Sequence, residues 1–282
     1  MARELSFARA ANVTWLTAAL LGVVQGLTEF LPVSSSAHLI LARAFFGWNV
    51  DEGAFGLAFD VALHLGTLVA ILIYFRRDLV LMLAAVPETF SAGRGPGKVI
   101  RLIVIGTIPM VIVGLLFADW LEAHVRTPAV VAVTLTAGAV WMLAAERFGG
   151  RTRDEDALTA GGALLVGAAQ ASALIPGMSR SGSTISMAML LGITREAAAR
   201  FSFLLGIPAM GAAAAKEGVH LVKTGMTAHD AGLFAVGMFT SAVVGFITIK
   251  FFLKYLVGHS LDVFAYYRLA LAAVTVAWIV SR

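Results

Sequence analysis

The chain has 282 residues, of which 59% are hydrophobic and 13% are charged, and its formal net charge is +4. A soluble domain of this length cannot bury that much apolar surface, so the composition predicts an integral membrane protein. The basic residues lie beside apolar segments and form no basic tail, which argues against a nucleic-acid partner. The absence of cysteine excludes disulfides and thiol chemistry.

The first apolar run, residues 13–24, follows Arg3 and Arg9, a pattern that also occurs in secretory signal peptides. A signal peptide would end in a cleavage site of small residues, but this run continues into Gln25, Glu29 and more apolar sequence. We therefore expect the run to be part of a membrane-embedded element.

Two stretches, residues 16–46 and 160–191, differ from ordinary transmembrane helices. Each contains two short apolar runs separated by proline, serine and charged residues. At about 1.5 Å per residue, a run of about a dozen residues reaches about 20 Å and cannot cross a hydrocarbon core of about 30 Å. We therefore predict two re-entrant helical hairpins.

Six other segments are apolar and approach the length of about 20 residues that a transmembrane helix needs. These are residues 55–75, 99–118, 128–145, 201–215, 231–252 and 263–280. The sequence thus predicts an all-α, polytopic helical membrane protein with six long transmembrane helices plus the two hairpins. We expect residues 1–282 to form one integral membrane domain.

The two hairpin stretches share a pattern in which Gly-x-x-Gln is followed by proline and then by serine. Each is followed by three spanning segments, and this odd number gives the two halves opposite orientations. We predict an inverted-topology repeat with halves at about residues 1–146 and 147–282, the alternative being a chance match in a glycine-rich and alanine-rich chain. The matching residues are Gly22, Gln25, Pro32 and Ser34 in the first stretch and Gly167, Gln170, Pro176 and Ser179 in the second.

The loops after the first, third and fifth spans are rich in lysine and arginine, which makes them cytoplasmic by the positive-inside rule. Asp51 and Glu52 mark a loop on the opposite side. Both chain ends are then outside, the first hairpin enters from outside and the second enters from the cytoplasm. The basic residues are Arg76, Arg77, Arg94, Lys98, Arg147, Arg151, Arg153, Lys250 and Lys254.

The first hairpin carries a polar group at its break. Gln25 and Glu29 share a helical face, and Glu29 lies just before Pro32, near the middle of the membrane. A carboxylate there costs about 2.5 to 3.5 kcal/mol unless it faces a partner or a wet cavity, so a functional site is the default interpretation. The alternative is a glutamate that reaches the surface from a short interfacial helix.

Ser34, Ser35 and Ser36 open the second half of this hairpin, at a helix N-terminus whose free N–H groups attract anions. His38 follows Ser35 by three residues and is expected on the same helical face. A serine here could instead serve only as a helix cap.

The second hairpin contains PGMSRSGST, in which Arg180 lies among hydroxyl groups at another helix N-terminus. The planar guanidinium matches phosphate, and hydroxyls and helix amides complete an oxyanion site. In the repeat, Arg180 corresponds to Ser35, so the two helix ends should converge; the alternative is an arginine paired structurally with Glu29 or Asp60. We expect the phosphate-binding residues to be Arg180, Ser179, Ser181, Thr184 and Ser34.

Three further polar residues could support this site. Asp60 and His64 are four residues apart in the first span, where they either reach the same cavity or brace the hairpins. Gln170 is the repeat counterpart of Gln25.

The motifs VVQGLTEFLPVSSSAH and PGMSRSGST, together with RFSFLLGIP at residues 200–208, resemble the undecaprenyl-diphosphatase family of bacterial membrane enzymes. The resemblance covers essentially the whole chain. It implies Gln25 and Glu29 as the E/Q-x-x-x-E element, Ser35 as the serine, His38 as the histidine and Arg180 as the phosphate-binding arginine. Two positions depart from the commonest family form: Gln25 replaces glutamate, and the serine stretch ends in Ser-Ala instead of Thr-Gly.

The resemblance implies hydrolysis of undecaprenyl diphosphate to the monophosphate and phosphate, which recycles the carrier lipid for cell-wall synthesis and gives bacitracin resistance. The expected location is the bacterial cytoplasmic (inner) membrane, with the site opening to the periplasmic face. One carboxylate beside a diphosphate also calls for a divalent cation, Mg²⁺ or Ca²⁺, on Glu29 and Gln25.

Three candidates for the attacking group stay open: Ser35 with Glu29 or His38 as base, His38 itself, and water on the metal. We favour Ser35.

The alternative function is a membrane carrier (flippase) for the lipid monophosphate or a small anion, because carriers share inverted repeats and broken helices. A homodimer is left open.

Overall fold

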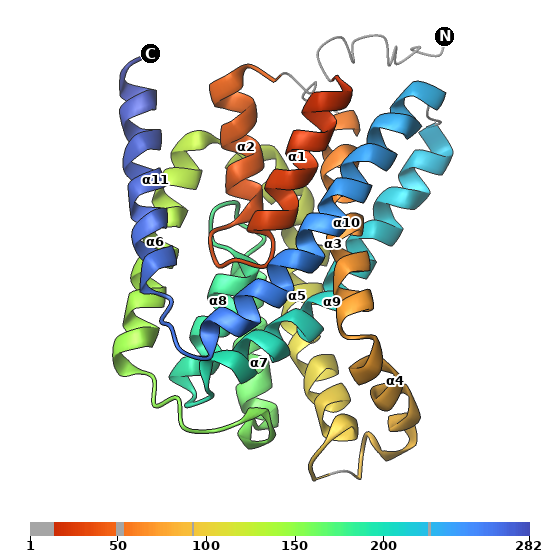
Figure 1. Cartoon of the computed structure of the whole chain (residues 1–282), viewed down its shortest axis with the longest axis vertical. Helices are drawn as coiled ribbons and strands as arrows, with labels where there is room; N and C mark the ends of the chain where they lie inside the picture. The colour runs from red at the N-terminus through yellow and green to blue at the C-terminus, as the bar shows by residue number, and fades with distance from the viewer. Residues whose placement is uncertain (1–13, 49–53, 92, 225–226) are drawn as a thin grey trace.

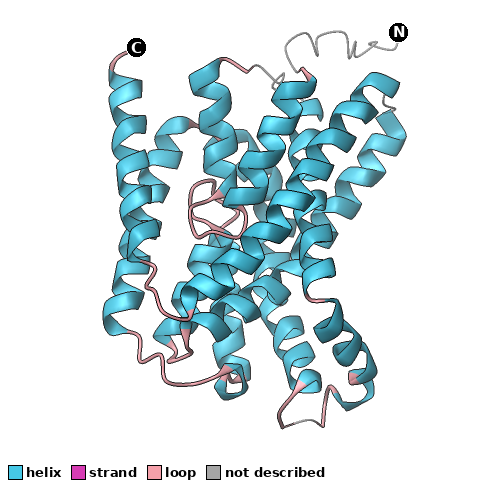
Figure 2. Cartoon of the chain, viewed as in Figure 1, coloured by secondary structure: helices cyan, strands magenta, loops and turns pink. Residues whose placement is uncertain are grey.

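The structure is a computed structural model that describes residues 14–48, 54–91, 93–224 and 227–282. Helices account for most of this described part (Figure 2). Arg3, Arg9, Asp51 and Glu52, which entered the signal-peptide and orientation arguments, lie outside the described residues.

The helices follow the order that the sequence predicts, a hairpin and then longer helices in each half (Figure 1). The first half contains α1 (Trp15–Thr28), α2 (Ser35–Phe46), α3 (Ala54–Tyr74), α4 (Arg76–Ala84), α5 (Pro96–Val125) and α6 (Pro128–Phe148). The second half contains α7 (Ala160–Ser172), α8 (Arg180–Leu190), α9 (Arg195–Thr224), α10 (Ala228–Leu256) and α11 (Asp262–Val280). Two short 3₁₀ helices are η1 (Val86–Glu88) and η2 (Glu155–Ala157).

Both predicted hairpins are present, α1–α2 and α7–α8. They come from opposite ends of the molecule, and their loops meet near its centre, where the Ser181 hydroxyl donates to the Leu31 carbonyl at 3.1 Å (Figure 1). The residues before α2 and α8 share a rare backbone conformation for a non-glycine residue, with φ of 74° at Ser34 and 70° at Ser179. This equivalence confirms the repeat alignment of the two hairpins.

Among the described residues, five helices, α5, α6, α9, α10 and α11, are long and apolar enough to cross a membrane. The sixth predicted span, residues 55–75, is α3, whose residues Ala58–Tyr74 form an apolar pair with α4 across a bend of 71°. The sequence did not predict α4, which occupies a basic segment assigned to a loop. Arg76–Ala84 contains neither glycine nor proline and has Asp78 in its first turn, and both features favour a helix.

Glycines let each hairpin pack closely against the middle long helix of the opposite half. A Cβ atom added to Gly26 of α1 would lie 2.8 Å from the Gly245 nitrogen of α10. One added to Gly167 of α7 would lie 2.1 Å from the Gly106 carbonyl oxygen of α5. Small residues permit such close approach of helices in lipid, so the two halves interlock around the hairpin loops.

The first loop is anchored by Phe30, which is completely buried directly after Glu29. Its ring meets Phe203 of α9 edge-on, with 5.3 Å between the ring centroids. This aromatic contact fixes the backbone that carries Glu29.

Candidate active site

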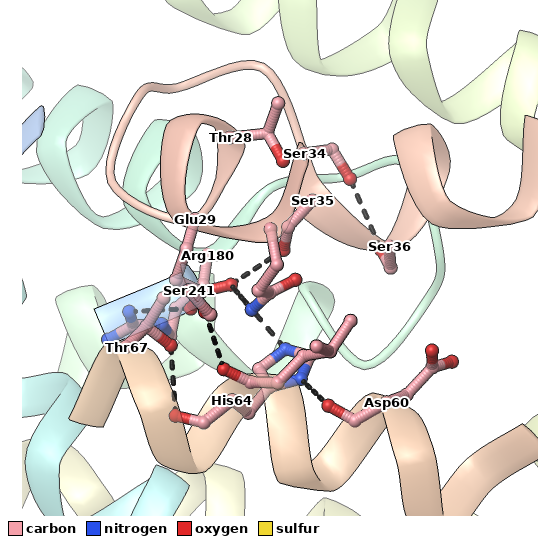
Figure 3. A network of polar contacts seen from close by, with 12 residues as sticks. Thr28, Glu29, Ser34, Ser35, Ser36, Asp60, His64, Thr67, Arg180 and Ser241 are labelled. Carbon is pink, nitrogen blue, oxygen red and sulfur yellow. Dashed lines mark hydrogen bonds and ion pairs between the residues drawn. The ribbon is translucent and has the colours of Figure 1, made fainter. Parts of the chain in front are cut away.

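The centre of the site is the Glu29 carboxylate, whose residue is only 6% exposed (Figure 3). Its Oε2 atom accepts a hydrogen bond of 2.6 Å from the Ser35 hydroxyl and one of 3.0 Å from the Gln25 amide. Its Oε1 atom accepts a hydrogen bond of 2.9 Å from Nη2 of Arg180. The structure therefore brings together residues that are 151 positions apart in the sequence.

Local backbone structure aims Ser35 at Glu29. Helix α1 ends at Thr28, and its C-cap residue Glu29 still donates its backbone N–H to the Gln25 carbonyl at 2.9 Å. Ser34 occupies the N-cap position of α2, but its hydroxyl makes no capping bond and lies 3.2 Å from the Ser36 hydroxyl. The Ser35 hydroxyl is engaged by the carboxylate, so helix capping does not account for Ser35.

Arg180 begins α8, so it faces Glu29 from the other hairpin. Ser179 caps this helix by accepting a bond of 3.1 Å from the Gly182 N–H. The guanidinium lies against α9 where Gly206 has no side chain: an added Cβ would come within 1.3 Å of Nη1 of Arg180. That Nη1 atom is buried without a hydrogen-bond partner, so one arm of the fork is free.

The predicted phosphate-binding hydroxyls serve mainly the protein itself. Thr184 is completely buried, donates to the Arg180 carbonyl at 2.7 Å and contacts the Ser202 hydroxyl, so it braces α8. Ser181 joins the two loops, and Ser179 caps α8. These contacts position Arg180.

His64 lies beside Glu29, with 3.4 Å between Nε2 of His64 and Oε2 of Glu29. Its Nδ1 atom is 2.8 Å from the Asp60 carbonyl oxygen, which orients the ring. The Asp60 side chain itself does not reach the site and points away from Glu29 in Figure 3. Its carboxylate is bound by Arg43 of α2 and by Arg126, so of the two roles expected for Asp60, bracing a hairpin agrees with these contacts better than reaching the cavity.

His38 makes no hydrogen bond with Ser35 or Glu29. This differs from the expectation that His38 lies on the same helical face as Ser35 and reaches the group that Ser35 contacts. Its Nδ1 atom is 2.7 Å from the Ser34 carbonyl, and its Nε2 atom is 2.7 Å from the Tyr267 hydroxyl of α11. The two rings stack with an interplanar angle of 4°. The backbone carbonyl and the tyrosine together turn the imidazole toward α11.

Gln170 makes no hydrogen bond to the residues around Glu29. Its side chain is completely buried, and neither its nitrogen nor its oxygen has a hydrogen-bond partner. The supporting role expected for Gln170 stays a prediction. In the repeat, Leu174 occupies the position that corresponds to Glu29, so Gln170 lacks the neighbouring carboxylate that Gln25 has.

Sequence reasoning missed Tyr267 and Arg268, both on α11. Arg268 is completely buried and donates to carbonyls of both hairpin loops. The signal was available, because a charged residue inside the predicted span 263–280 marks a functional position by default. No comparable signal identified Tyr267.

The donor set for a divalent cation is small. Among the described residues there is no group of three or more His, Cys, Asp or Glu side chains that could hold a metal ion. The Oε1 atom of Gln25, however, is buried without a partner on the same amide whose nitrogen donates to Glu29. One carboxylate and one amide oxygen fit Mg²⁺, which commonly takes its remaining ligands from substrate phosphates and water.

The arrangement is suited to phosphoryl chemistry. A serine hydroxyl bonded to a carboxylate pairs a nucleophile with a group that can act as its general base. The guanidinium and the N-termini of α2 and α8 supply positive potential for an anion. Fold and site together define a polytopic helical membrane protein with a buried, anion-directed serine site between two re-entrant hairpins.

Comparison with known proteins agrees with this class. The sequence model of the family described as "Bacitracin resistance protein BacA" matches residues 18–274, and the chain belongs to that family. It is 46% identical over 266 residues to an "Undecaprenyl-diphosphatase" of Rubrobacter xylanophilus, covering 93% of this chain and 97% of the relative. A protein of the same name from Hahella chejuensis is 43% identical over 270 residues, covering 95% and 99%.

Proposed function

We propose that the protein hydrolyses undecaprenyl diphosphate to undecaprenyl monophosphate and phosphate, and that it thereby recycles the carrier lipid of cell-wall synthesis and gives bacitracin resistance. The names of its relatives support the substrate. The observation that carries the chemistry is the hydrogen bond of 2.6 Å from the Ser35 hydroxyl to Glu29, whose other oxygen is bound by Arg180.

In the proposed reaction, the Ser35 oxygen attacks the terminal phosphorus while its proton moves to Oε2 of Glu29. The bridging P–O bond breaks, and its electron pair leaves with the lipid monophosphate. Arg180 and the amides at the N-termini of α2 and α8 neutralise the charge that develops on the phosphoryl oxygens. Glu29 passes this proton to the departing monophosphate oxygen and so becomes a base again. Water then attacks the phosphoserine phosphorus while giving a proton to Glu29, the P–O bond to Ser35 breaks, and the Ser35 oxygen takes that proton.

We further propose that Glu29 and Oε1 of Gln25 hold a divalent cation, Mg²⁺ or Ca²⁺. When bound, such a cation would offset the repulsion between the Glu29 carboxylate and the diphosphate. The free Gln25 oxygen beside Glu29 supports this assignment. Isothermal titration of the substrate-free protein with Mg²⁺ tests it, and heat of binding that persists in Glu29→Gln protein would contradict it.

The carrier alternative is not favoured, because the relatives are named as phosphatases and because a carrier has no need of a serine bonded to a carboxylate. The test is phosphate release from a short-chain prenyl diphosphate by purified protein in detergent, where no transmembrane gradient exists. Ser35→Ala protein should be inactive, and mass spectrometry after a rapid quench should find a phosphoryl group on Ser35. A phosphoryl group on His38, or turnover by Ser35→Ala, would contradict the serine assignment.

We propose an inner-membrane location with the site opening to the periplasmic face. The basic loops on the side of α4 support this orientation by the positive-inside rule. Single cysteines replacing Asp51 and Arg153 should label from opposite faces, Asp51 from outside. Labelling of both from one face would contradict the orientation. Whether the protein is a homodimer is a separate question, which light scattering of the same detergent samples tests.

A further inference from the structure

Arg268 is completely buried in α11, and its guanidinium donates hydrogen bonds to backbone carbonyl oxygens of three separate segments. Within the described part of the chain, no carboxylate bonds to it. The acceptors are Pro32 in the first loop at 3.2 Å, Gly177 and Met178 in the second loop at 2.8 and 3.2 Å, and Thr134 and Leu135 of α6 at 3.2 Å each.

These acceptors explain how a buried arginine is tolerated. Loops at mid-membrane depth have carbonyl groups that lack helical partners, and leaving such groups unpaired in a nonpolar interior is costly. A guanidinium has five N–H donors in a fixed planar fork, so a single arginine can satisfy several carbonyls at once. The charge of Arg268 and the carbonyl groups of the loops therefore compensate one another.

The surroundings of the guanidinium are shaped to hold it. A Cβ added to Gly138 of α6 would lie 1.9 Å from Nη2 of Arg268, and one added to Gly182 of α8 would lie 3.1 Å from Nη1. Glycine at these two positions leaves the slot that the guanidinium fills. Any side chain at Gly138 must displace Arg268 from its carbonyl partners.

We propose that Arg268 is a positioning residue that holds the two hairpin loops at the separation at which Glu29 meets Arg180. The two loops carry opposite parts of the site, and Arg268 is bonded to both of them. Displacement of about 1 Å between groups that must act together can cost about 10²-fold in rate. The catalytic consequence of this inference rests on the proposed phosphatase function, whereas the loop geometry can be measured without it.

The geometry is tested by cross-linking. The chain contains no cysteine, so Leu31→Cys with Met178→Cys introduces the only two thiols, one in each loop, beside the Pro32 and Met178 carbonyls that both accept from Nη1 of Arg268. The Ser181 hydroxyl can still donate to the backbone carbonyl at position 31. Gly138→Ala and Arg268→Met should each slow disulfide formation by oxidant, by about fivefold or more, because the loops separate. Gly114→Ala is the matched control, since a Cβ there meets nothing within 4 Å.

Turnover is measured in the same backgrounds without the added cysteines. Gly138→Ala should lower kcat about tenfold or more with folded protein retained, because alanine favours a helix more than glycine does. Arg268→Met removes the donors altogether and should have the larger effect. Gly138→Ala is the decisive variant if Arg268→Met does not fold.

Unchanged cross-linking in Gly138→Ala protein would overturn the proposal, and so would slower cross-linking with kcat within about twofold of the parent. Slower cross-linking together with reduced kcat supports it. Failure of the parent protein to release phosphate would contradict the proposed function, while the cross-linking result would still decide whether Arg268 positions the loops.

Discussion

The two hairpins share a backbone but carry different chemistry. Each has a first helix with the Gly-x-x-Gln pattern, a loop, and a serine with φ near 70° before the second helix, Ser34 with 74° and Ser179 with 70°. At the next position the first hairpin has Ser35 and the second has Arg180. The duplicated backbone thus presents a hydroxyl from one side and a cation from the other.

This difference explains why the repeat has one site instead of two. Glu29 in the first hairpin corresponds to Leu174 in the second, so only one carboxylate lies at the meeting point of the loops. In the second hairpin, Gln170 corresponds to Gln25, but its side-chain amide has no hydrogen-bond partner. An inverted repeat places the same backbone features on both sides of the membrane centre, and substitutions at a few positions then assign the roles.

The largest expected effect comes from removing the Glu29 carboxylate, which the first hairpin has and the second lacks. Glu29→Gln keeps the shape of the side chain but loses the base for Ser35 and the charge for a cation, so kcat should fall on the order of 10³-fold. Gln25→Glu, which restores the commoner family residue, should be tolerated or tighten metal binding. Phosphate-release kinetics at low Mg²⁺ check both, and near-parent turnover by Glu29→Gln would remove the carboxylate from the mechanism.

The next largest effect is expected at Arg180, the positively charged side chain of the second hairpin. Arg180→Lys keeps the charge but loses the planar fork that fits phosphate, so turnover should fall by about 10²-fold. Arg200→Lys is a control, because Arg200 pairs with Asp78 at 2.7 Å with both side chains about one-third exposed, and such pairs contribute little. Equal, mild losses in the two variants would leave Arg180 with only long-range attraction.

A smaller effect should follow from crowding Arg180 without replacing it. Gly206→Ala places a methyl group where Nη1 of Arg180 now lies and should lower kcat about tenfold through displacement of the guanidinium. Gly211→Ala in the same helix meets nothing within 4 Å and should be neutral or slightly stabilising. Turnover and thermal unfolding of both variants make the comparison, and matching turnover would contradict the assigned role of Gly206.

The smallest effect tests the histidine of the first hairpin, which has no equivalent in the second. Tyr267→Phe removes the hydroxyl from Nε2 of His38 but keeps the ring stack, a change worth about 0.5 to 1.5 kcal/mol for one hydrogen bond. Turnover should therefore fall about twofold to tenfold. The neighbouring Tyr266→Phe should be neutral. If Tyr267→Phe also lowers turnover in a His38→Ala background, the tyrosine acts on something other than His38.

Sequence patterns predicted the hairpins well because their signals are local. The bounds 16–46 and 160–191 agree with α1–α2 and α7–α8 to within a residue. Proline and clustered polar residues interrupt apolar runs that are too short to span, and these features do not depend on distant contacts. The helix α4 was missed because a basic, partly polar segment gives no strong periodic signal.

The site was predicted in part. Spacing alone placed Glu29, Ser35 and Arg180 at the same depth, since each lies at a hairpin break. Spacing could not tell which of His38 and His64 meets Glu29, because both lie on helices whose rotation is set by packing. Spacing also left open whether Asp60 reaches the cavity or braces the hairpins, and the ion pairs with Arg43 of α2 and with Arg126 favour bracing.

By itself, the sequence determined the membrane environment, the broken helices, the inverted repeat and the residues at the two hairpin breaks. Hydropathy, proline positions and helical spacing carry that information along the chain. The tertiary structure decided which partners meet: Arg180 with Glu29, His38 with Tyr267, and Arg268 with the carbonyls of both loops. The physical reason is that close helix contacts at glycines such as Gly26 and Gly167 fix helix rotation and distance, which short-range sequence patterns do not encode.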